Sequence, residues 1–171
     1  MASTYTPIAT ANGTGSSTVI SFTSIPQTYT DLVLVCRTIT TAATNNTDIG
    51  IRFNSDSSFS SYSRTMLYGT GSAAGSARST QSQVNEMYID YYGGMGNATY
   101  PGLQIVNIMN YSNTTTYKTT LTRSNNPSGG MDLLVGLWAS TSAITTIDTV
   151  VDSNSNLATS TMMTLYGIKA A

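Results

Sequence analysis

The composition describes a small chain with an unusually uncharged surface. Of its 171 residues 40% are hydrophobic, enough for one core, but only 9% are charged, against about 25% in an average globular protein. The seven Lys and Arg form no cluster and there is no histidine, which excludes a basic stripe for nucleic acid and any catalytic or metal site built on imidazole.

The N-terminal segment has neither the basic region nor the apolar core of a signal peptide. The longest uninterrupted apolar run is residues 32–36, far below the roughly 20 residues of a membrane-spanning helix. We therefore expect synthesis in a cytoplasm, no membrane contact, and one domain over residues 1–171. The single cysteine, Cys36, lies in this apolar run and is expected to be a small buried hydrophobe.

In chain order, apolar residues repeatedly alternate with polar ones over short segments separated by turn residues, which predicts strands. No helix-period segment of useful length occurs. The expected strands are residues 5–9, 17–23, 31–39, 48–54, 65–68, 84–91, 103–111, 117–123, 132–139 with 144–150, and 161–168.

Short links between the expected strands favour antiparallel pairing. Asn12-Gly13 suits a tight hairpin turn and residues 125–130 suit a longer one. Because each sheet must hide one face, the prediction is an all-β fold: an antiparallel β-sandwich, jelly-roll-like, of about ten short strands.

Two segments do not show strand alternation and are candidate contact loops. Residues 69–83 are small and polar with three glycines, which predicts a mobile loop. Residues 91–102 combine glycines with aromatic side chains, and tyrosine is a residue type suited to interfaces and to stacking on sugars. The candidate contact surface is Tyr91, Tyr92, Met95 and Tyr100. Trp138, Tyr111 and Tyr166 lie in apolar strand patterns and are expected to be packing residues.

Carboxylate chemistry is the catalysis that the composition leaves open. Glu86 and Asp90 would share a strand face but lie roughly 13 Å apart, beyond the range for glycoside hydrolysis. Residues 152–156 begin like a calcium loop, yet Leu157 and Met163 occupy the places of the turn glycine and the bidentate glutamate. We therefore expect no catalytic residue, no metal, no cofactor and no enzymatic activity.

Several sequence segments, spread over nearly the whole chain, resemble segments of a known group of proteins. They are residues 1–10 (MASTYTPIAT), 25–35 (IPQTYTDLVLV), 110–113 (NYSN) followed by 117–119 (YKT), 136–144 (GLWASTSAI) and 165–168 (LYGI). Together they resemble a group of small virion structural proteins of tailed phages of aquatic bacteria (cyanophage-like), in which related domains also occur in tail fibres.

The resemblance implies a β-sandwich located on the exterior of a virion, assembled after synthesis in the host cytoplasm. The first role it implies is a capsid decoration (cement) protein, a homo-oligomer with a trimer favoured, that binds the major capsid protein and stabilises the shell. The alternative is a tail fibre, adaptor or receptor-binding module that contacts tail proteins and recognises a host-surface glycan. A free-standing carbohydrate-binding module is a third interpretation.

Overall fold

The structure is a computed structural model that describes residues 4–43, 48–80, 87–90, 96–151 and 155–169. These residues form twelve strands and no helix, so none of them belongs to a helix that could span a bilayer. The strands are β1 (Tyr5–Asn12), β2 (Val19–Phe22), β3 (Asp31–Thr38), β4 (Ile49–Phe53), β5 (Tyr62–Gly69), β6 (Ala74–Ser79), β7 (Met87–Tyr88), β8 (Gly102–Met109), β9 (Lys118–Asn126), β10 (Gly130–Trp138), β11 (Ile147–Val151) and β12 (Met162–Ile168).

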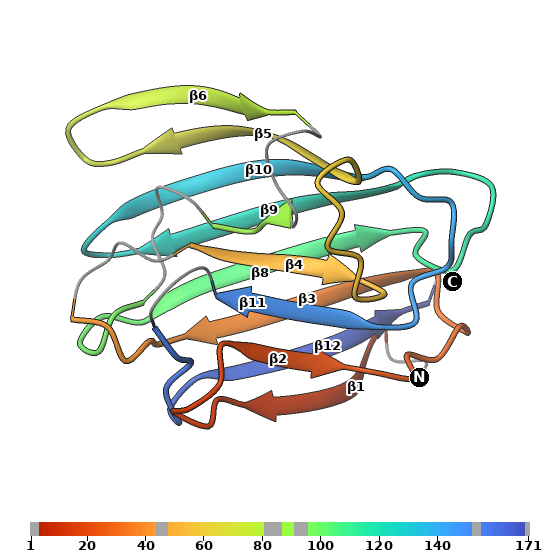
Figure 1. The fold of residues 1–171 in the computed structure, drawn as a ribbon, viewed down its shortest axis with the longest axis horizontal. Helices are drawn as coiled ribbons and strands as arrows, with labels where there is room; N and C mark the ends of the chain where they lie inside the picture. Colours follow the sequence, from red (N-terminus) through yellow and green to blue (C-terminus); the bar gives the residue numbers. More distant parts are fainter. Residues whose placement is uncertain (1–3, 44–47, 81–86, 91–95, 152–154, 170–171) are drawn as a thin grey trace.

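Two antiparallel sheets pack face to face (Figure 1). The larger sheet has the order β1-β12-β3-β8-β9-β10-β5-β6 and the smaller one β2-β11-β4-β7. The segment β1-β12-β3-β8, together with the smaller sheet, has the strand order of a jelly roll, in which two Greek keys interleave. The predicted all-β sandwich with a jelly-roll arrangement is confirmed.

Two hairpins enlarge one side of this jelly roll. The β5–β6 hairpin follows β4 in the chain and the β9–β10 hairpin follows β8. In the larger sheet β9 pairs with β8, and β5 pairs with β10, so both hairpins extend the sheet beyond β8. The larger sheet thereby gains four strands that have no counterpart in the smaller sheet. In Figure 1 the β5–β6 hairpin extends beyond the smaller sheet, which lies in front.

The core lies between the two sheets. Its buried side chains include Ile20, Phe22, Leu32, Leu34, Cys36, Ile49, Ile51, Phe53, Val106, Ile108, Tyr111, Trp138, Ile147 and Leu165. The predictions for Cys36, Tyr111 and Trp138 are therefore confirmed, and the Trp138 ring packs on Phe53 with centroids 5.5 Å apart. Tyr166 is partly buried and packs against the Tyr5 ring edge to face, at 6.3 Å.

The prediction of a loop over residues 69–83 is wrong in its centre. Residues 74–79 form β6, which pairs in regular register with β5. The alternation of apolar and polar residues is missing because β6 buries no side chain on either face. Backbone pairing with β5 places it in the sheet, and the sequence pattern carries no signal for that pairing.

Candidate interaction surface

Of the predicted contact residues, Tyr100 is the one that the structure describes. Tyr91, Tyr92 and Met95 lie outside the described residues. The Tyr100 side chain is 47% exposed. Its backbone is fixed by Asn97, whose Oδ1 accepts hydrogen bonds from the amides of Thr99 and Tyr100, each at 2.8 Å. A half-exposed ring therefore projects from an ordered turn.

The start of this turn is anchored to the end of β3. The Gly96 carbonyl accepts hydrogen bonds from Thr40 N at 2.9 Å and Thr40 Oγ1 at 3.1 Å. A Cβ atom at Gly96 would lie 2.1 Å from the Thr38 carbonyl oxygen, so only glycine allows this close approach. The position of Tyr100 is thus set by the jelly-roll core.

A second surface, which the sequence reasoning missed, is the outward face of the larger sheet. Side chains alternate between the two faces of a strand, and the positions that point away from the smaller sheet carry many large apolar residues. We call this surface the outer face. Its exposed apolar members are Tyr5, Leu67, Leu103, Met109, Leu121, Met131, Leu133, Val135 and Met162.

Strand pairing brings several of these side chains next to one another. Leu133 of β10 lies opposite Leu67 of β5, and Val135 lies opposite Leu121 of β9. Directly opposed side chains on one face have Cβ atoms about 5 Å apart. Leu67, Leu133 and Val135 are 58%, 41% and 53% exposed. The centre of the outer face is therefore a contiguous apolar cluster.

Strands β9 and β10 depart from the polar-out, apolar-in pattern of an ordinary sandwich strand. The outward positions of β10 are all apolar, while its inward positions include the buried Asp132. The inward positions of β9 are polar throughout: Lys118, Thr120, Thr122, Ser124 and Asn126, all buried. Because burial in the sandwich does not explain outward apolar residues, their placement favours contact with another molecule.

The buried polar groups beneath these strands are engaged inside the protein. Lys118 Nζ donates to the carbonyls of Thr116 at 2.9 Å and Thr141 at 3.2 Å, and burial lowers the pKa of Lys118. Ser124 Oγ donates to Asp132 Oδ2 at 3.2 Å. These contacts serve the packing of the enlarged sheet.

Of the two carboxylates considered for catalysis, Asp90 is the one that the structure describes. Asp90 is buried, and its Oδ2 accepts from Gln104 Nε2 at 3.1 Å, while Gln104 Oε1 accepts from Thr38 at 3.0 Å. Glu86 and the calcium-like residues 152–154 lie outside the described residues. Among the residues placed by the structure, no three His, Cys, Asp or Glu side chains gather as a metal site would require.

Charge on the outer face is mainly positive. Alternation places Arg37, Arg78 and Arg123 on it, and Arg123 lies between Ile105 and Leu133 of the neighbouring strands. Arg37 also donates to the Ser160 carbonyl at 2.7 Å. Asp31 lies at the rim, where Oδ1 accepts from the Asn110 amide at 2.6 Å. Arginine among apolar residues is typical of protein interfaces.

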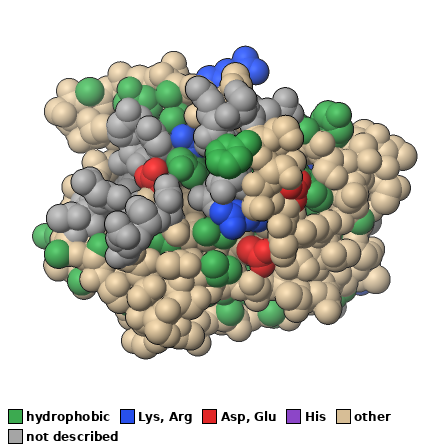
Figure 2. All heavy atoms as spheres, in the orientation of Figure 1, with side chains coloured by type: hydrophobic (Ala, Val, Ile, Leu, Met, Phe, Trp, Pro, Cys, Tyr) green, Lys and Arg blue, Asp and Glu red, His purple; other side chains and the backbone are tan. Residues whose placement is uncertain are grey.

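The opposite side of the sandwich, formed by the smaller sheet, has a different character. Among the described residues, Figure 2 shows mostly backbone and uncharged polar side chains there, with scattered hydrophobic side chains and with basic and acidic side chains close together near the middle. Arg52 and Asp148 are directly opposed on β4 and β11, and Asp148 Oδ2 also accepts from Ser55 at 2.8 Å. The two sides of the protein are therefore chemically distinct.

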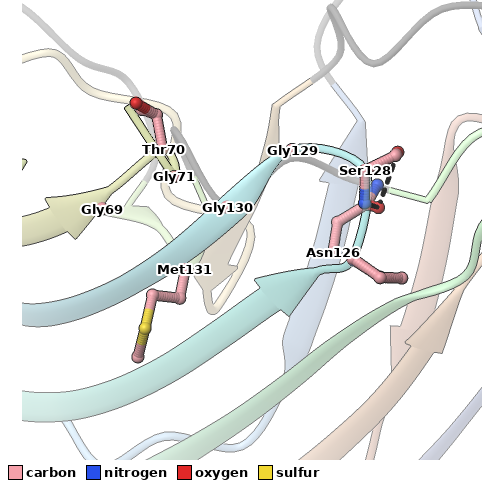
Figure 3. A pocket seen from close by; sticks show the side chains of 9 residues that line it. Gly69, Thr70, Gly71, Asn126, Ser128, Gly129, Gly130 and Met131 are labelled. Carbon is pink, nitrogen blue, oxygen red and sulfur yellow. Dashed lines mark hydrogen bonds between the residues drawn. The ribbon is translucent and has the colours of Figure 1, made fainter. Parts of the chain in front are cut away.

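Two hollows lie at one end of the outer face. A hollow of about 430 Å³ separates the β5–β6 turn at Thr70 from the β9–β10 turn at Asn126 (Figure 3). A second of about 270 Å³, lined mainly by Leu67, Tyr68, Met131 and Leu133, adjoins it. Asn126 Oδ1 already accepts from Ser128 N and Oγ, both at 2.9 Å. The hollows extend the apolar surface and bring few unused polar groups.

Comparison of the chain with models of known protein families, with curated proteins and with solved structures found no match.

Proposed function

We propose that this chain is a structural docking protein that attaches to a larger protein assembly through the outer face of its eight-stranded sheet. The observation that carries this proposal is the apolar outward side of β10, which turns Met131, Leu133 and Val135 toward solvent. Burying apolar surface contributes roughly 25 cal/mol per Å². A partner that covers this cluster would gain that stabilisation, while the isolated chain does not.

The assembly we propose is the capsid of a tailed phage, with the chain as a decoration protein on the major capsid protein. The resemblance of several sequence segments to small virion proteins supports this choice. The fold is compatible with it, since jelly rolls recur in viral capsid domains, although they also recur in lectins and a fold alone assigns no function.

A binding experiment with particles tests the docking face. Particles of the encoding phage that lack this protein are mixed with the purified chain and sedimented. Leu133→Lys puts a charge in the centre of the apolar cluster and is expected to lower the bound fraction at least tenfold. Val19→Lys is the matched control, because Val19 is an exposed apolar residue, 37% exposed, on the smaller sheet. Equal binding by both variants would contradict the proposed docking face.

The copy number in purified particles tests the location. A decoration protein is expected at a level comparable to the major capsid protein on a stained gel. A few copies per particle would instead favour a tail position.

A glycan-binding tail module is the second candidate, favoured by the half-exposed Tyr100 on its ordered turn. Tyrosine rings stack on sugar faces through their apolar surface. In this case Tyr100→Ala is expected to weaken particle attachment to host cells, whereas Tyr117→Ala, which removes a 56% exposed tyrosine elsewhere, is the control. Unchanged adsorption of the Tyr100 variant would argue against a glycan role for this ring.

A further inference from the structure

Strand β6 forms one open edge of the larger sheet among the described residues. It lies at the edge of the larger sheet, pairs with β5, and has no buried residue. The smaller sheet reaches β5 through β7, but within the described chain it makes no substantial contact with β6. An edge strand exposes a row of backbone donors and acceptors to any strand that approaches it.

The other three sheet edges carry features that hinder strand addition. On β1, Pro7 removes a backbone donor and the register shifts between Pro7 and Ala9. The edge strands of the smaller sheet are short in the part of the chain that the structure describes, where β2 has four residues and β7 has two. In contrast, β6 has six residues in regular register, no proline and a single charged residue, Arg78.

The direction of the backbone groups of β6 follows from its turn. Thr70 N donates to the Ala73 carbonyl at 2.9 Å, so Thr70 and Ala73 form a hydrogen-bonded pair. Such pairs alternate with non-bonded pairs along an antiparallel ladder. Ala74, Ser76 and Arg78 are therefore the positions whose N–H and C=O groups point away from β5.

We infer that β6 pairs antiparallel with β6 of a second copy of this chain, around a two-fold axis at Ser76. In this register Ser76 lies opposite Ser76 of the second copy, and Ala74 lies opposite Arg78 on both sides. All three outward residues form hydrogen-bonded pairs, giving about six new backbone hydrogen bonds. The two larger sheets join into one continuous sheet, and both outer faces point the same way.

The side chains of β6 fit a second copy of the same strand. The single charge, Arg78, meets Ala74 and not another arginine, so the register brings no like charges into opposition. The remaining residues are Ala, Gly and Ser, which do not obstruct an approaching strand. At Gly75 a Cβ atom would lie 2.7 Å from the Tyr68 hydroxyl oxygen, so glycine lets β6 lie flat beside β5.

Solution mass tests this pairing independently of the proposed docking function. Sedimentation of the purified chain at micromolar concentration is expected to give twice the chain mass of 18.1 kDa. Ser76→Pro removes an outward donor and places its ring on the free edge, and is expected to give the monomer mass. Ser76→Ala keeps the backbone donor and should remain a dimer.

Loss of the dimer in Ser76→Pro would also follow from misfolding, so two further substitutions at Ser76 are needed. They test the pairing without proline and test the register of β6 against β6. Ser76→Lys places two ammonium groups opposite each other and should dissociate the dimer, with partial recovery at high salt. Ser76→Cys should form an intersubunit disulfide, since hydrogen-bonded pairs have Cα atoms about 5.5 Å apart. Thr65→Cys, exposed on the same face of β5, should not, and the native Cys36 is buried.

A monomeric wild-type chain would overturn the inference. So would the trimer mass that the sequence resemblance implies, or a dimer that persists in both Ser76→Pro and Ser76→Lys. The pairing and the docking function can fail separately. Leu133→Lys can lose particle binding and remain a dimer, and a Ser76 variant can lose the dimer and still bind particles.

Discussion

Trp138 packs in the hydrophobic core and also makes a side-chain hydrogen bond. Its ring is buried against Phe53, and its Nε1 donates a hydrogen bond to Asp56 Oδ2 at 2.8 Å. A buried indole N–H without a partner would be costly. The sequence predicted the buried ring from its apolar strand, but the partner Asp56 lies far away in the chain and could not be predicted.

The acid stability of the protein should depend on Asp56. Burial alone would raise the pKa of Asp56, but hydrogen bonds from Trp138, Ser61 and Ser58 outweigh it and lower the pKa from 3.8 to about 2. A carboxyl group with a lowered folded-state pKa contributes stability above pH 3.8 that is lost as the pH falls through about 2.

Denaturant unfolding followed by the fluorescence of the single tryptophan measures this contribution. We expect the stability difference between wild type and Asp56→Asn to be largest above about pH 4 and to shrink toward about pH 2, because protonation then removes the charge that the variant lacks. A difference that stays constant over this range would contradict the assignment.

At the scale of elements, alternation predicted most strands because one face of each is buried. β2, β3, β4, β8 and β12 fall within or close to their predicted ranges. β6 was not predicted, because its residues are small or polar and none of them is fully buried. The assignment of strands to sheets was also beyond the sequence, because the two inserted hairpins join the larger sheet through long-range pairing.

The contact between the inserted β10 and the smaller sheet depends on a glycine. A Cβ atom at Gly136 would lie 1.8 Å from Met87 Sδ and 2.7 Å from Thr120 Oγ1. Gly136→Ala should therefore destabilise the protein by about 1–3 kcal/mol through overpacking, measured as the free energy of unfolding in urea.

Gly69→Ala is the control for that measurement. Its nearest contact would be Met131 Cγ at 3.9 Å, an ordinary van der Waals distance, so the change should cost much less. If both substitutions had the same effect, close packing of Met87 on β10 would not be the cause.

For the molecule as a whole, the sequence predicted the fold class, whereas the apolar outer face was not among the surfaces it pointed to. Tyrosines beside glycines are expected in contact loops, and apolar residues within strands are expected in the core. Residues 130–138 contain apolar residues at both alternating positions, which a strand buried on two sides would also show. Only the structure reveals that the smaller sheet leaves the outer face uncovered.

Neighbouring leucines of β10 provide a direct test of which side is core. Leu134 is 1% exposed and points inward, whereas Leu133 is 41% exposed on the outer face. Leu134→Ala should cost about 2–5 kcal/mol of unfolding free energy through cavity formation. Leu133→Ala should cost about 1 kcal/mol or less in the isolated chain, yet weaken particle docking, because the proposed docking would bury its side chain. A large loss of stability from Leu133→Ala would mean that this side chain stabilises the fold. That result would contradict the proposal that the outer face is a docking surface.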